Sequence, residues 1–352
     1  MPQAHAYAID SPTGKFRPTT IERRDPGPTE IAFDIKFAGI CHSDIHTARS
    51  EWGPTRYPLV PGHEIAGVVT KIGPDVTKFA VGDRVGVGCF VDSCGQCDQC
   101  RAGHEQFCSG PGGTIWTYNC VGRDGLITAG GYSTSITVEQ DYVCRIPDAI
   151  SLAQAAPLLC AGITTYSPLK RWGAGPGKRV AIVGMGGLGH MGVQIAAAMG
   201  AEVAVISQTM AKQADGLRFG ASEYHALSEP DTLKKLRGSF DLMIATVAAA
   251  TDLTPFVNCL KIGSGAAIVD VGLPQHPVTL AVRALCAGNR IFAGSQIGGI
   301  AETQEMLDFC AEHGLAAQVE VIAGDQIDAA YELVIGSQVR YRYVIDTATI
   351  PQ

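Results

Sequence analysis

The stretch that decides the fold is Arg179-Val-Ala-Ile-Val183, followed by Gly184-Met-Gly186-Gly187-Leu188-Gly189-His-Met-Gly192 and then by Val193-Gln-Ile-Ala-Ala-Ala-Met199. An apolar strand, a glycine-rich turn with Gly187 and Leu188 at its centre, and a helix in this order are typical of a dinucleotide-binding unit. Gly184 and Gly186 permit the tight turn and a close approach to a pyrophosphate, and Gly189 lets helix and strand pack closely. The helix N-terminus offers N–H groups to the anion. A purely structural glycine turn is the alternative interpretation.

The sequence around this stretch predicts two domains. From about residue 155, apolar strands at 202–206, 242–245, 266–269 and 290–293 alternate with helical patterns, which is typical of a parallel sheet covered on both faces. The first third is β-rich, with alternating runs at 30–37 and 65–72. After about residue 296 we expect one helical stretch, 303–313, and a closing strand, 341–346. That strand is similar to the first third, so we predict one domain from 1–154 with 296–352, and an inserted domain from 155–295.

The residues after the second strand of the inserted domain indicate which dinucleotide it binds. An NAD-preferring site usually places an acidic residue there to bind the ribose 2′-hydroxyl. This chain has Ser207-Gln208-Thr209 instead, with Lys212 one helical turn further on. A 2′-phosphate would meet no repulsion there and could receive a charge-assisted contact from the lysine, so we expect NADP(H). The alternatives are a solvated Lys212 and dual cofactor specificity.

Four cysteines, Cys94, Cys97, Cys100 and Cys108, have the spacing C-x2-C-x2-C-x7-C. Zn²⁺ takes four thiolates in a tetrahedral, closed structural site, and short loops can bring such ligands to one point. Disulfides would need an oxidising compartment, and an iron–sulfur site would use a similar set of ligands. We predict a structural zinc site.

A second set of candidate ligands is dispersed along the chain: Cys41, His63 and Cys160. Catalytic zinc needs three protein ligands and one open position, and two cysteines with one histidine form a known set for alcohol oxidation. Each residue taken singly would more often be an ordinary buried residue. The combination predicts a catalytic zinc.

The composition excludes several classes of protein. A chain of 352 residues with 46% hydrophobic and 17% charged residues fits a well-packed enzyme with more than one core. A net charge of −7 argues against nucleic acid as a partner, and the short apolar runs argue against a membrane span. The N-terminus shows no basic segment before an apolar core, so we expect no signal peptide and a cytoplasmic location.

Motifs along nearly the whole chain carry a family resemblance. They are Gly39-Ile-Cys41-His42-Ser43-Asp44, Tyr57-Pro-Leu-Val-Pro-Gly62-His63-Glu64, the four-cysteine segment, Thr117-Tyr118-Asn119, Gly130-Gly131-Tyr132-Ser133, the glycine loop and Val339-Arg340-Tyr341-Arg342-Tyr343. With them the chain resembles the zinc-dependent medium-chain alcohol dehydrogenases, and within these the cinnamyl alcohol dehydrogenases and bacterial NADPH-dependent aldehyde reductases. The resemblance implies an α/β fold with a GroES-like β-rich catalytic domain and a Rossmann domain containing a doubly wound parallel sheet.

The resemblance also implies roles for residues near the dispersed ligands. Glu64 would be a carboxylate able to approach the metal, and Asp44 would orient His63. Ser43 would hydrogen-bond the substrate oxygen and pass its proton to His46. Trp52 and Trp116 would shape an aromatic substrate pocket, although both could equally be core residues.

The expected activity is reversible hydride transfer between NADP(H) and primary alcohols or aldehydes, aromatic or of medium length, with one catalytic and one structural Zn²⁺ per chain. A homodimer, paired through the nucleotide domains, is expected from the family. Two alternatives remain open: a metal-free quinone or enoyl reductase, and a non-catalytic NADPH-binding protein.

Overall fold

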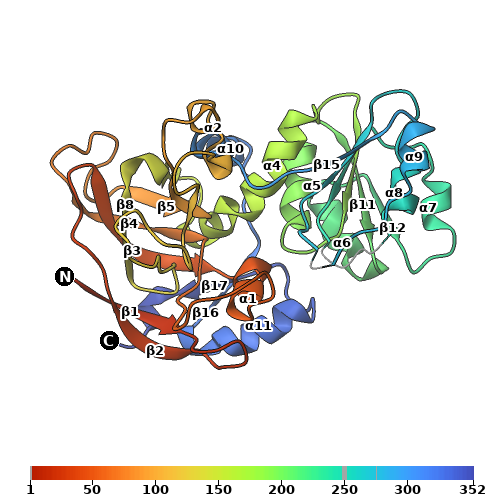
Figure 1. Cartoon of the computed structure of the whole chain (residues 1–352). Helices are drawn as coiled ribbons and strands as arrows, with labels where there is room; N and C mark the ends of the chain where they lie inside the picture. Colours follow the sequence, from red (N-terminus) through yellow and green to blue (C-terminus); the bar gives the residue numbers. More distant parts are fainter. Residues whose placement is uncertain (1, 248–251, 275) are drawn as a thin grey trace. The chain divides into compact units, whose positions relative to one another are not determined.

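The computed structural model describes residues 2–247, 252–274 and 276–352. The chain divides into two compact units. The first contains residues 1–160 and 298–352, and the second contains residues 161–297 (Figure 1). Among the described residues, no helix has both the length and the apolar character needed to cross a membrane.

The first unit is built on a seven-stranded sheet. Strand β3 (Glu30–Gly39) lies in its middle and pairs antiparallel with β4 (Ile65–Ile72), β8 (Ser135–Glu139) and β17 (Arg342–Asp346). The sheet also contains β5 (Arg84–Val87), β9 (Cys144–Arg145) and β16 (Val319–Ile322). The predicted strands at 30–37, 65–72 and 341–346 therefore all form. Because β17 is hydrogen-bonded to β3, the end of the chain is part of the same sheet as its first third (Figure 1).

Shorter elements surround this sheet. The strands are β1 (Gln3–Ala8), β2 (Arg17–Glu22), β6 (Phe90–Asp92) and β7 (Ile115–Trp116); the helices are α1 (His42–Ala48), α2 (Asp98–Arg101), α3 (Leu152–Ala155), α10 (Ile300–Glu312) and α11 (Ile327–Ile335). The expectation of one helical stretch after residue 296 is wrong, since α11 follows α10. Its signal is an apolar i, i+3, i+4, i+7 pattern, Ile327, Ala330, Tyr331 and Val334, and all four side chains are buried.

The second unit contains the predicted parallel sheet. In the described residues its six strands lie in the order β12-β11-β10-β13-β14-β15, and every adjacent pair is parallel. The strands are β10 (Arg179–Val183), β11 (Glu202–Ser207), β12 (Glu223–Ala226), β13 (Leu242–Ala245), β14 (Ala267–Asp270) and β15 (Ile291–Gly294). The central strands β10 and β13 are almost wholly buried, as a sheet covered on both faces requires.

Helices cover both faces of this sheet. The helices are α4 (Ala161–Arg171), α5 (Gly189–Ala198), α6 (Gln213–Arg218), α7 (Thr232–Lys235), α8 (Thr254–Val257) and α9 (Val282–Cys286). Figure 1 shows α4 and α5 on one side and α7, α8 and α9 on the other. The predicted doubly wound Rossmann fold is thereby confirmed, with the glycine loop between β10 and α5.

Candidate metal centres and cofactor site

The four-cysteine segment folds into a compact loop in the first unit. The Sγ atoms of Cys94, Cys97, Cys100 and Cys108 all lie within 4.8 Å of one another. The backbone N–H groups of Gln96 and Cys97 donate to the Cys94 sulfur at 3.4 and 3.3 Å. Gly110 is needed beside this loop, because a Cβ there would collide with the same sulfur. Four sulfurs gathered in this way fit the closed tetrahedral zinc site that the spacing predicts.

The dispersed candidate ligands also come together in the first unit. Cys41 precedes α1, His63 precedes β4, and Cys160 follows a short 3-10 helix at 156–159. The Cys160 sulfur lies 3.9 Å from the Cys41 sulfur and 3.3 Å from His63 Nε2. One donor atom of Glu64 joins these three, all four within 4.8 Å of one another, and every one of these residues is buried.

Glu64 gives an independent test of whether this group fits a cation. Its side chain is fully buried and pairs with the buried Arg342 of β17 through Oε1, while Oε2 has no hydrogen-bond partner among the described residues. A buried carboxylate oxygen without a partner costs free energy. Burial also raises the pKa of Glu64 to about 7, against the opposing charge of Arg342. A zinc ion among these donors would satisfy the unpaired oxygen, so the residues fit the metal.

The electrostatics of the dispersed group favour a thiolate. The pKa of Cys41 lies well below its usual value, chiefly because of the hydrogen bond with Cys160, and His63 and Arg342 act in the same direction. A deprotonated sulfur is the form that binds a metal. Gly39 is required nearby, because a Cβ there would collide with Oε2 of Glu64.

Asp44 lies on α1 and against His63. Its Oδ1 is 2.9 Å from His63 Nδ1, so Nε2 is left for the metal. Its Oδ2 accepts the backbone N–H of Cys41 at 2.9 Å, which holds the start of the helix. One buried carboxylate therefore fixes two of the predicted ligands.

The predicted proton path begins on the same helix. Ser43 Oγ lies 3.7 Å from the Cys41 sulfur. The His46 ring is stacked on Trp52, with centroids 4.7 Å apart and an interplanar angle of 26°. Trp52 is 44% exposed, and Trp116 lies in the short strand β7.

Sequence reasoning missed the partners of His46 and Glu64. Glu51 Oε2 lies 2.5 Å from His46 Nδ1, because Ser50, with φ at +55°, turns the chain and Glu51 N–H donates to the His46 carbonyl. Arg342 pairs with Glu64. A possible signal for Arg342 was its place between apolar residues of a buried strand, where a charge requires a buried partner.

The glycine loop of the second unit has the geometry that its sequence predicts. A Cβ on Gly189 would collide with the Gly184 carbonyl oxygen, whereas a Cβ on Gly186 would meet open space. Lys212 donates to the carbonyl of Met185, inside the loop, at 3.1 Å. Ser207 ends β11, and Gln208 follows it, so these predicted cofactor residues lie at the carboxyl ends of β10 and β11.

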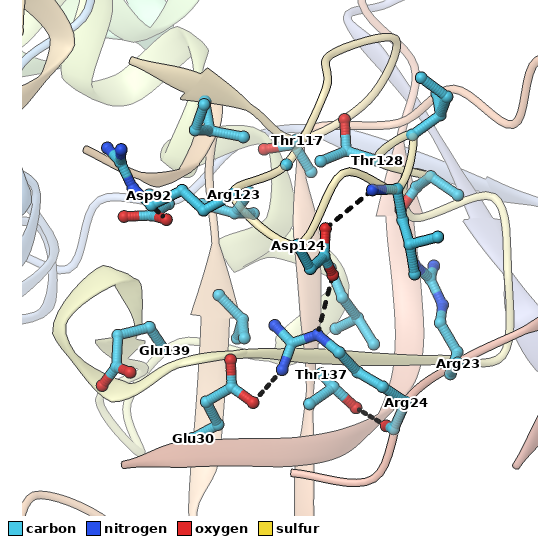
Figure 2. A pocket seen from close by; sticks show the side chains of 18 of the residues that line it. Arg23, Arg24, Glu30, Asp92, Thr117, Arg123, Asp124, Thr128, Thr137 and Glu139 are labelled. Carbon is cyan, nitrogen blue, oxygen red and sulfur yellow. Dashed lines mark hydrogen bonds and ion pairs between the residues drawn. The ribbon is translucent and has the colours of Figure 1, made fainter. Parts of the chain in front are cut away.

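A separate cavity of about 470 Å³ lies in the first unit. Figure 2 shows Arg24 between Glu30 and Asp124, and Arg123 Nε lies 2.8 Å from Asp92 Oδ2. Because these arginines already pair with carboxylates, we assign the cavity no ligand. The predicted zinc ligands lie elsewhere in the unit.

Two known domain families match this chain. Residues 27–148 match the alcohol dehydrogenase GroES-like domain, and residues 187–312 match the zinc-binding dehydrogenase domain. NADP-dependent alcohol dehydrogenase C 1 of Mycolicibacterium smegmatis is 58% identical over 350 residues, covering 99% of both chains. The probable formaldehyde dehydrogenase AdhA of Bacillus subtilis is 54% identical over 348 residues, also covering 99% of both.

Two solved structures are similar over nearly their whole length. The cinnamyl alcohol dehydrogenase SbCAD4 of Sorghum bicolor matches with a TM-score of 0.95 and 40% identity, covering 100% of both chains. The CAD of Helicobacter pylori, complexed with NADP(H), matches with a TM-score of 0.92 and 41% identity, covering 98% of both.

Proposed function

The chain belongs to the zinc-dependent alcohol dehydrogenases, and from this premise we propose that it interconverts primary alcohols and aldehydes with NADP(H). The observation that carries the proposal is the buried group of Cys41, His63, Glu64 and Cys160, gathered from distant parts of the chain. A metal-free reductase would not need such a group. We propose that residues 1–154 with 296–352 form the catalytic domain and residues 155–295 the cofactor domain. The two compact units divide a few residues later, at 160/161 and 297/298, so Cys160 belongs to the same unit as Cys41 and His63.

Two sets of residues would hold zinc. Cys41, His63 and Cys160 would hold the catalytic ion, and Cys94, Cys97, Cys100 and Cys108 would hold the structural one. When bound, the catalytic zinc supplies Lewis-acid polarisation of the substrate oxygen, and NADP(H) supplies or accepts the hydride. Glu64 would approach the catalytic ion with its unpaired oxygen.

The proton leaves by side chains of α1. In alcohol oxidation Ser43, beside Cys41, would hydrogen-bond the substrate oxygen, accept the alcohol's proton and give up its own hydroxyl proton towards His46, which would pass a proton to solvent. An imidazole suits this step because its ordinary pKa is close to neutrality. Glu51 and Trp52 hold the His46 ring from two sides, which supports this role.

The glycine loop of the second unit would hold the cofactor. The backbone of Gly184, Gly186, Gly187, Leu188 and Gly189 would bind the pyrophosphate, and Ser207, Gln208 and Lys212 would bind the 2′-phosphate. Lys212 is already held near the loop by the Met185 carbonyl, and a charge-assisted contact from its ammonium group accounts for a preference for NADPH.

The substrate class is an aldehyde or primary alcohol with an aromatic or medium-length apolar chain. Trp52 and Trp116 are proposed to line its pocket. The names of the similar proteins, which include a formaldehyde dehydrogenase and cinnamyl alcohol dehydrogenases, span both small and aromatic substrates.

We propose further that the enzyme is a cytoplasmic homodimer. Strand β15 is a terminal strand of its sheet, pairs with β14, and carries Ile291, which is 43% exposed. An edge of this kind is suited to antiparallel pairing with a second copy. The twelve cysteines, all within the described ranges, are unpaired, which fits a reducing compartment.

The decisive experiment is a set of initial rates for benzaldehyde, cinnamaldehyde, hexanal and formaldehyde with NADPH and with NADH. We expect reduction of the aromatic and medium-chain aldehydes, with NADPH strongly preferred. Replacement of Lys212 by Ala should lower the NADPH preference by about 10- to 100-fold, the value of a charged hydrogen bond. Lys234→Ala is the matched control, because that lysine lies on α7, away from the glycine loop in sequence, and pairs with Asp231 at the start of the same helix. A protein without bound zinc and without turnover on this panel would refute the proposal.

A further inference from the structure

The buried carboxylate of Asp44 accepts more hydrogen bonds than orienting one histidine requires. Its Oδ1 receives the Gly62 N–H at 3.1 Å and faces His63 Nδ1 at 2.9 Å. Its Oδ2 receives the Cys41 N–H at 2.9 Å and the hydroxyl of Tyr132 at 3.5 Å. The side chain of Asp44 is fully buried, so these donors are what replaces water around its charge.

The Tyr132 hydroxyl is itself hydrogen-bonded to a second tyrosine hydroxyl. Tyr331, on α11, donates to the Tyr132 oxygen at 3.4 Å, and its ring packs edge-on against Phe16, with centroids 5.1 Å apart. Tyr132 is 0% and Tyr331 5% exposed. A chain of two phenols therefore runs from the C-terminal helix through the core to the carboxylate that faces His63.

The backbone fixes the first phenol in place. The segment 130–132 pairs with the segment 60–62 through three hydrogen bonds, Gly130 N–H to Val60, Gly131 N–H to Gly62 and Tyr132 N–H to Pro61, at 2.8, 2.9 and 2.9 Å. Gly62 has φ at +107°, and a Cβ there would lie 2.7 Å from the Tyr132 ring. The glycines of both motifs thus permit Tyr132 to pack directly beside the residue that precedes His63.

Both phenols remain donors at neutral pH. Burial, with the nearby charge of Asp44, raises the pKa of Tyr132 and of Tyr331 well above the usual value. A third hydroxyl, that of Tyr118, lies 3.4 Å from His63 Nδ1, on the same side of the imidazole as Asp44.

We propose that Tyr132 and Tyr331 are positioning residues of the catalytic zinc site, which act through Asp44 on His63. Together with the backbone N–H groups of Cys41 and Gly62, the Tyr132 hydroxyl holds the carboxylate in the orientation in which Oδ1 accepts the His63 Nδ1 hydrogen and directs Nε2 to the metal. Outer partners of this kind change metal affinity or activity by about 10- to 100-fold when they are removed. The inference rests on the proposed catalytic zinc.

The experiment measures zinc release to a chromophoric chelator from the folded, zinc-loaded full chain. Tyr132→Phe keeps the ring but removes the hydroxyl, and we expect one of the two zinc ions to leave about tenfold faster, with the other unaffected. Tyr331→Phe lies one hydrogen bond further away and should accelerate release of the same ion by about two- to threefold. The visible spectrum of the Co²⁺-loaded Tyr132→Phe protein should shift. Its kcat should fall, while KM for NADPH stays unchanged.

The matched control is Tyr7→Phe. Tyr7 is a buried tyrosine of the same hydrophobic core, but its ring packs against Gly324. The inference would be overturned if Tyr132→Phe and Tyr331→Phe released both zinc ions at the wild-type rate. It would also be overturned if Tyr7→Phe accelerated zinc release as much as these two variants do. If Tyr132→Phe does not fold, the comparison of Tyr331→Phe with Tyr7→Phe decides it. A wild-type chain that binds no zinc at the dispersed group and shows no turnover would instead refute the proposed function.

Discussion

The two donor groups of this chain are built in opposite ways. The ligands of the four-cysteine group lie within one short loop, and three of the four are partly exposed. In the dispersed group, Cys41 and Cys160 are 119 residues apart, and every donor is buried. A short loop closes at a small entropic cost, whereas the dispersed group exists only once the domain has folded. The loop is suited to stabilising the fold, and the buried group to chemistry that needs a dry, shaped site.

The largest effect is expected from breaking the dispersed group. Cys41→Ser should lower turnover by more than about a thousandfold, because a Lewis acid contributes several kcal/mol and each 1.4 kcal/mol is a factor of ten. The variant should still fold and bind NADPH, since the glycine loop lies in the other unit. Steady-state rates and a fluorescence titration with NADPH check this. Turnover within tenfold of the wild type would contradict the assignment.

Loss of one ligand of the four-cysteine group should lower stability and leave turnover largely unchanged. Cys97→Ser should lower the free energy of unfolding by more than about 5 kcal/mol, because structural zinc contributes directly to folding. Molecules that remain folded should keep most of their turnover. Thermal denaturation and the activity per folded molecule measure the two effects separately. Unchanged stability would exclude a structural role.

The ion pair behind the dispersed group provides an intermediate effect. Arg342→Met leaves Glu64 buried without its cation and should cost about 3 to 5 kcal/mol. The pKa of Glu64, already raised to about 7 by burial, should rise further, so the folded variant binds a proton that the unfolded chain releases. Its stability, measured without zinc, should therefore fall as pH rises from about 5 to 8. The double variant with Glu64→Gln should lose this pH dependence. If the double variant still lost stability as pH rises, the titration of Glu64 would not be the cause of the pH dependence.

The smallest effect concerns a single hydroxyl beside the loop. Ser93 Oγ lies 3.1 Å from the Cys100 sulfur and 2.7 Å from the Tyr142 hydroxyl. Ser93→Ala should cost about 1 kcal/mol and speed release of the structural zinc without changing turnover. Calorimetry and chelator kinetics test it. Faster release of the catalytic ion would mean that the two sites are coupled.

The sequence predicted most of the fold because its signals are local. The strand, glycine turn and helix at 179–199 lie in one stretch, and apolar runs mark the other strands of the parallel sheet. It did not predict α11, whose short amphipathic pattern lies near the end of the chain. The partners of the site residues were also missed. Arg342, Tyr132 and Tyr331 reach Glu64 and Asp44 through tertiary packing, which no spacing along the chain encodes.

The most direct test is zinc per chain measured together with turnover in the wild type, Cys41→Ser and Cys97→Ser. We predict two zinc ions in the wild type and one in each variant, with turnover abolished only in Cys41→Ser. A Cys41→Ser protein that retains two zinc ions, or an active one with a single zinc, would contradict the assignment of the dispersed group as the catalytic centre.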